Sequence, residues 1–187
     1  MEILSRSETS RLIVILLTIA LVEASPEGGV IKEYEVKAAF LYNFAKFVEW
    51  PREAFEGTTG KIEICVLGRN PFGSALLDAV RGKSIGSRDF AVREIAAAQE
   101  AAGCHILFVS DSERRQLGSV LKAIKSRYVL TVGESDEFLA NGGLINFVLR
   151  DSNVRFQANT EAISRAKIQI SSKLLRIAVV AKQRGFQ

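Results

Sequence analysis

The only histidine, His105, directly follows Cys104, and these two residue types can form a nucleophile–base couple. The run CHILFVS is typical of a strand, in which successive side chains point to opposite faces, so the two side chains diverge. A serine-based triad would need the histidine exposed beside a nucleophile and a carboxylate, whereas His105 opens an apolar strand. Two cysteines and one histidine are also too few for a zinc site, and we expect no metal.

Paired carboxylates could do acid/base chemistry, and three occur close together at Glu134, Asp136 and Glu137. They lie in a turn flanked by Gly and Ser, and no apolar residues surround them to favour the protonated acid that glycoside hydrolysis needs. We therefore predict that the chain is not an enzyme and has no cofactor. A hydrolase ranks last among the functions considered.

A ligand site is the stronger chemical candidate. The segment Gly68–Gly73 (GRNPFG) follows one predicted strand, and Ser110-Asp111 follows another. Ligands of open α/β sheets bind at the carboxyl ends of strands, so Arg69, Asn70, Ser110 and Asp111 are candidate ligand-binding residues. The segment is not a phosphate loop, because no Lys-Ser/Thr pair follows its last Gly. The alternative is structural, with Asn70 and Ser112 capping the helices that follow.

The elements that would position these residues alternate between strand and helix. Hydrophobic periodicity predicts a helix at 33–50, ended by Pro51, and a long final helix at 160–182. Between them we predict strands at 61–68, 89–95, 104–109 and 128–132, short helices after Asn70 and at 96–102, a helix at 112–126, and a hairpin of strands 144–149 and 154–157. This order predicts a three-layer α/β sandwich with a mixed, mostly parallel sheet flanked by helices. The central strand is 104–109, and the first and last helices cover one face.

The first helix carries apolar residues over a broad arc. Ala38, Leu41 and Ala45 mark one stripe, and Phe40, Phe44 and Phe47 a second stripe beside it. An arc of this width predicts that the helix is buried on more than one side.

The amino terminus predicts export. Arg6 and Arg11 precede the apolar run Leu12–Val22, which is shorter than the roughly 20 residues of a membrane span. Small residues at Val22 and Ala24 suit signal peptidase, so we expect a signal peptide at 1–24, a flexible lead-in at 25–32 and a single domain at 33–187. The alternative is an uncleaved anchor or a core helix.

The formal net charge of +4 is scattered rather than clustered, which argues against a nucleic-acid partner.

In an exported chain, the even number of cysteines favours a disulfide between Cys65 and Cys104. This bond requires the two Cα atoms to lie within about 7 Å of each other. The alternative is a pair of reduced, buried thiols, which apolar strands accommodate well.

Most of the chain after residue 32 resembles the YfiR family of exported bacterial proteins. The resemblance lies in 36–51 (VKAAFLYNFAKFVEWP), 64–73 (ICVLGRNPFG), 104–110 (CHILFVS), 129–135 (VLTVGES) and 142–178. It implies a periplasmic α/β protein, often dimeric, that holds down an inner-membrane diguanylate cyclase by binding its periplasmic sensor domain. Cys65 and Cys104 match a disulfide of the family. A second cysteine pair, found near the hairpin of the best-known relative, is absent from 145–147 and 150–152 here.

The function best supported by the sequence is a non-enzymatic periplasmic repressor of a membrane diguanylate cyclase, acting by contact and controlling cyclic di-GMP and biofilm. An export signal, the absence of a later membrane span and the absence of a catalytic constellation support it. We expect a homodimer and an exposed apolar patch as docking surface. The alternative is a small-ligand binding module at the strand ends around Arg69 and Ser110.

Overall fold

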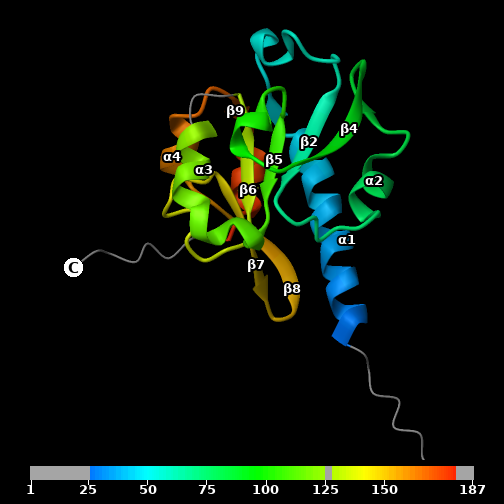
Figure 1. Cartoon of the computed structure of the whole chain (residues 1–187), viewed down its shortest axis with the longest axis vertical. Helices are drawn as coiled ribbons and strands as arrows, with labels where there is room; N and C mark the ends of the chain where they lie inside the picture. The colour runs from blue at the N-terminus through cyan, green and yellow to red at the C-terminus, as the bar shows by residue number, and fades with distance from the viewer. Residues whose placement is uncertain (1–25, 125–127, 180–187) are drawn as a thin grey trace, which may run out of the picture.

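The structure is a computed structural model that describes residues 26–124 and 128–179. Its main feature is a seven-stranded sheet in the order β3-β4-β2-β5-β6-β7-β8 (Figure 1). The predicted signal peptide at 1–24 and the end of the predicted final helix lie outside the described residues.

The five inner strands of this sheet run parallel to one another, and the alternation of strand and helix over 61–132 predicts this arrangement for the first four in the chain. They are β4 (Arg88–Ile95), β2 (Ile62–Leu67), β5 (Ile106–Val109), β6 (Leu130–Gly133) and β7 (Ile145–Arg150). The edge strands β3 (Ser84–Ile85) and β8 (Asn153–Ala158) are antiparallel to their neighbours. All four residues of β5 are buried, because this central strand is covered on both faces. The predicted mixed, mostly parallel sheet is confirmed.

Helices cover both faces of the sheet, which confirms the three-layer sandwich. One face packs against α1 (Pro26–Ala45), α2 (Ala75–Val80), α4 (Thr160–Ser164) and α5 (Ser172–Ile177), around a core that includes Leu41, Phe44, Phe108, Phe147 and Leu174. The opposite face packs against η2 (Ala98–Ala101) and α3 (Leu117–Ile124), around Leu107, Val120 and Phe138, and the short helix η3 (Asp111–Gln116) leads into α3. The first and last helices therefore share one face, as predicted.

The first helix differs from its predicted bounds of 33–50. It begins at Pro26, within the predicted lead-in, and ends at Ala45. After a turn, the chain forms β1 (Val48–Glu49), which pairs with β9 (Gln169–Ile170) in a separate two-stranded sheet. This pairing captures Val48, so the helix stops before Pro51, which instead precedes the short helix η1 (Arg52–Phe55).

The predicted long helix at 160–182 is wrong over its described part. The segment divides into α4, β9 and α5 because Ile170 pairs with Val48 and buried Ile168 anchors the chain before it. A new helix then starts at Ser172, where the Ser171 side chain accepts a hydrogen bond from the Lys173 amide.

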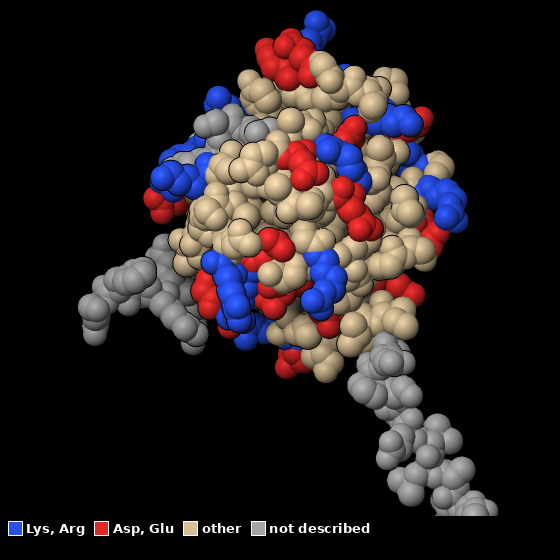
Figure 2. Space-filling view, viewed as in Figure 1, with Lys and Arg blue, Asp and Glu red and all other residues tan. Residues whose placement is uncertain are grey.

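Positive and negative side chains are interspersed over the face seen in Figure 2, with no stripe of one sign. This face therefore carries no clustered basic surface of the kind that nucleic-acid binding requires.

Candidate functional site

The carboxyl ends of β2 and β5 meet at one edge of the sheet, as the sequence predicts. The Ser110 amide donates to the Leu67 carbonyl at 3.1 Å, and the Arg69 amide donates to Ser112 Oγ at 3.0 Å. Gly68 makes this approach feasible: its φ is +86°, and a Cβ at this position would lie 2.4 Å from Ser112 Oγ. The four candidate ligand-binding residues are therefore brought to the same edge.

Two of these four residues already have hydrogen-bond partners within the chain. Asn70 accepts from the Phe72 amide at 2.8 Å, and its Nδ2 donates to Glu94 at 2.7 Å. The Ser110 hydroxyl accepts from the Ser112 amide, so Ser110, rather than the predicted Ser112, caps the helix that follows. Asn70 stabilises a turn, and α2 begins only at Ala75. Arg69 and Asp111 are exposed, and a ligand-binding role for the four residues stays a prediction.

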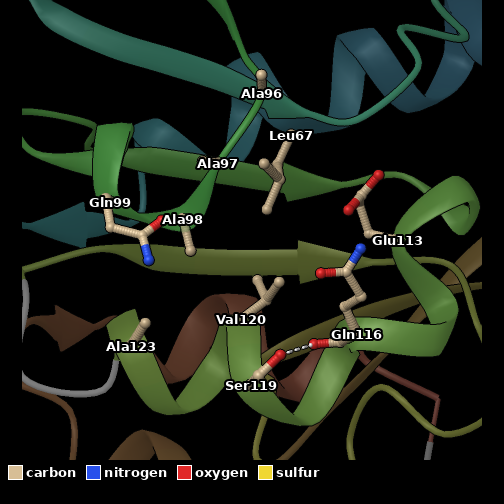
Figure 3. Close-up of a pocket in the computed structure, with 10 residues that line it drawn as sticks. All are labelled: Leu67, Ala96, Ala97, Ala98, Gln99, Glu113, Gln116, Ser119, Val120 and Ala123. Carbon is tan, nitrogen blue, oxygen red and sulfur yellow. Dashed lines mark hydrogen bonds between the residues drawn. The ribbon is translucent and has the colours of Figure 1, made fainter.

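Two hollows flank the turn at 68–74. The larger, which we call the α1–α2 groove, has a volume of about 600 Å³ and is lined by Ile31, Tyr34, Glu35, Ala39, 71–75, Asp78, Ala79 and Lys83. The smaller, of about 160 Å³, lies between the end of β4, η2 and α3 (Figure 3). Its apolar lining consists of Leu67, Val120 and four alanines. The Ser119 hydroxyl donates to the Gln116 carbonyl, so it is not free to bind a ligand.

A buried ion cluster joins α1 to the end of β6. Lys37 is only 5 % exposed, and its Nζ lies 2.7 Å from Glu134 Oε2 and also contacts Glu33. The Tyr34 hydroxyl donates to the same Glu134 carboxylate at 3.1–3.2 Å. Burial, reinforced by this carboxylate, raises the pKa of Tyr34 well above its usual value. The cluster fastens α1 to the carboxyl edge of the sheet.

The sequence does not reveal this cluster, because Glu134 stands beside Asp136 and Glu137 in what its flanking Gly and Ser predict to be a single acidic turn. The structure separates them. Asp136 is exposed, and Glu137 forms an ion pair with Arg114 on the surface. The one available signal was the position of Lys37 beside Ala38, on the apolar side of a helix. The three carboxylates do not form a catalytic pair.

His105 is completely buried and packs on its own side of β5, away from Cys104. Its Nδ1 accepts a hydrogen bond from the Glu63 amide at 3.1 Å, and its ring lies 4.3 Å from that of Phe55 and 5.6 Å from that of Trp50. Burial, with a smaller contribution from Arg88, lowers the pKa of His105 to about 4. The histidine is thus a neutral core residue, and the expected separation from Cys104 is confirmed.

A disulfide joins Cys65 to Cys104, as predicted. The Cα atoms are 5.8 Å apart, and the bond links β2 to Cys104, two residues before β5, on the face covered by α3. Arg93 secures the loop before Cys104 by donating to the carbonyls of Glu100 and Ala102 at 3.1 and 3.0 Å. The bond is therefore enclosed between the central strands.

An α/β fold with a disulfide between Cys65 and Cys104 is what the resemblance implied, and the structure has both. The YfiR/HmsC-like family model matches residues 34–179. The chain belongs to the YfiR/HmsC-like family. At the level of the family, its members are periplasmic regulators of diguanylate cyclases rather than enzymes. No curated protein matches the chain. Among the described residues, no helix is long and apolar enough to cross a bilayer.

Proposed function

We propose that this YfiR/HmsC-like protein is exported to the periplasm, where it represses an inner-membrane diguanylate cyclase by binding it. The family match over residues 34–179 carries this proposal. The buried Cys65–Cys104 bond supports it, because structural disulfides persist in oxidising compartments such as the periplasm. Release of the cyclase would raise cyclic di-GMP and favour biofilm.

Repression of this kind needs only a difference in affinity. A regulator shifts the cyclase toward its inactive state by as much as it binds that state more tightly than the active one. To change the active fraction from nearly all to nearly none, this preference must be about 10⁴-fold. A non-catalytic protein can supply this preference through contact alone. In this proposal the active protein is a homodimer.

The test is a clean deletion in the native host with cyclic di-GMP as the readout. Deletion should raise cyclic di-GMP, and the full-length gene should restore it. A gene that lacks residues 1–24 should not restore it, because its product stays inside the cell. Cross-linking followed by purification from membranes should recover a diguanylate cyclase with the protein. Unchanged cyclic di-GMP after deletion would sink the proposal.

A further inference from the structure

We propose that the smaller hollow, which we call the η2–α3 pocket, receives one aromatic side chain of the cyclase, next to a basic residue in the cyclase sequence. This inference rests on the proposed function for the identity of the partner, and it adds a contact site and its chemistry. The pocket lies where β4 ends, between η2 and α3, and none of the four candidate ligand-binding residues lines it.

The pocket exists because small side chains meet between the end of β4 and α3. Ala96, Ala97 and Ala98 follow β4, and Ala123 lies on α3. These side chains end at Cβ, so they leave the space between η2 and α3 unfilled. The volume of about 160 Å³ is close to the roughly 150 Å³ at which an apolar protein cavity binds benzene. The pocket therefore has room for one aromatic ring.

The floor of the pocket is apolar, and its rim is open to solvent. Leu67 and Val120 are only 1 % and 7 % exposed, whereas Ala96 and Ala123 are exposed. A ring that enters past the alanines and packs on Leu67 and Val120 would be withdrawn from water. Aromatic anchors held in this way dominate the binding energy of many protein–protein contacts.

Two side-chain amides frame the pocket. Figure 3 shows Gln99, on η2, and Gln116, at the end of η3, on opposite sides of the space. The hydrogen bond that Gln116 accepts from Ser119 uses its backbone carbonyl, which leaves its side-chain amide available. Each side-chain amide offers both donors and an acceptor, which match the backbone amides on either side of an aromatic residue. This frame favours a residue of a protein chain over a free aromatic molecule.

A carboxylate at the rim sets the charge of the occupant. Glu113 lines the pocket, and its Oε1 accepts a hydrogen bond from Ser112 Oγ at 3.1 Å, which orients the side chain. Among the ion pairs of the described residues, none includes Glu113. Complementary charge therefore favours a lysine or arginine beside the aromatic residue of the cyclase.

Three blocked dipeptides test the ring and the charge separately. The full chain is expressed with its own residues 1–24, and the protein that accumulates is purified oxidised. N-acetyl-phenylalanyl-arginine amide should shift the backbone amide resonances of Gln99 and Ser119 in ¹⁵N–¹H spectra. The alanyl-arginine probe, which lacks the ring, should bind about tenfold more weakly, and the phenylalanyl-glutamate probe about threefold more weakly. Equal binding of the three probes, or shifts confined to another part of the protein, would overturn the proposal.

Two leucine substitutions on α3 give a matched control. Lys122 and Ala123 are adjacent and both exposed, but only Ala123 lines the pocket. Ala123→Leu should fill the pocket and abolish binding of the phenylalanyl-arginine probe, whereas Lys122→Leu should bind it at least as tightly as the wild type. Both variants should unfold at the wild-type midpoint. Unchanged binding by Ala123→Leu would contradict the proposal.

Removing the carboxylate tests the charge. Glu113→Gln should bind the phenylalanyl-arginine and phenylalanyl-glutamate probes equally. A preference for arginine that survives in this variant would contradict the assignment of a basic residue to the occupant.

Cyclic di-GMP in the deletion strain separates this inference from the proposed function. The Lys122→Leu gene should restore the low level that the wild-type gene restores, and the Ala123→Leu gene should not. If deletion raises cyclic di-GMP but Ala123→Leu represses fully, the pocket is not a cyclase contact and the proposed function stands. A deletion without effect refutes the proposed function, even where the probes bind the pocket.

Discussion

Lys37 Nζ lies 2.7 Å from Glu134 Oε2, and this contact joins two residues 97 positions apart in the chain. Both side chains are withdrawn from water, with 6 % and 8 % of their surfaces exposed. Between them they connect α1 to the end of β6, at the edge where β2 and β5 also end. The orientation of α1 on the sheet therefore depends on a charge pair as well as on the apolar core.

Removing one member of this pair should strongly destabilise the protein. Lys37→Met leaves the Glu134 carboxylate buried with fewer partners, and we expect a loss of about 3 kcal/mol in the free energy of unfolding by urea. Combining it with Glu134→Leu should recover most of the loss, because no buried charge then remains. Arg165→Met, in the exposed pair with Glu161, is the control and should have little effect. Equal effects of the two single variants would contradict this account.

Stability should fall in acid because of His105. Its pKa is about 4 in the folded protein and about 6.5 when unfolded, so the unfolded chain binds more protons between these values. The contribution of neutral His105 to the free energy of unfolding is fully present above the unfolded pKa. It is lost as the pH falls toward about 4, by about 3 kcal/mol in total. Urea titrations of the wild type and of His105→Phe should show a steeper loss for the wild type. Parallel pH profiles would rule out this role.

Gly68→Ala should destabilise the protein more than an alanine substitution at another glycine with a positive φ. Alanine at 68 must adopt a positive φ and also place its Cβ against Ser112 Oγ. Gly86 is the matched control, because its φ is +59° and a Cβ there meets nothing within 4 Å. We expect Gly86→Ala to cost about 1 kcal/mol and Gly68→Ala about 2–3 kcal/mol, measured by thermal unfolding. A smaller loss at position 68 than at 86 would show that the edge can relax.

Replacing both cysteines by alanine should remove about 4 kcal/mol of stability, since the bond closes a loop across a separation of 39 residues. The oxidised wild type, the wild type treated with a dithiol reductant and the Cys65→Ala/Cys104→Ala variant can be compared by urea unfolding. The reduced wild type and the double variant should unfold at similar, lower midpoints. An unchanged midpoint would mean that the apolar core alone holds β2 to β5.

The sequence predicted elements whose signals are local. The run Ile106–Val109, inside the predicted strand 104–109, is apolar throughout and forms the central strand β5. The turn at 150–153 was recognisable, and Asp151 and Ser152 adopt the positive φ values of a tight hairpin. The pairing of Val48 with Ile170 was not predictable, because it joins distant segments that each fit a helical pattern. For the same reason the sequence did not bring Lys37 to Glu134, although it did place Arg69 near Ser110 at one edge of the sheet.

The Cys65–Cys104 disulfide fastens the middle of the sheet, where four pairs of residues join β2 to β5. Because the sequence has two cysteines, a single oxidation event completes its disulfide bonding. Under the proposed function, an envelope that loses oxidising power would accumulate less of the repressor. Reductive stress would then raise cyclic di-GMP because less folded repressor is present, without any dedicated thiol sensor.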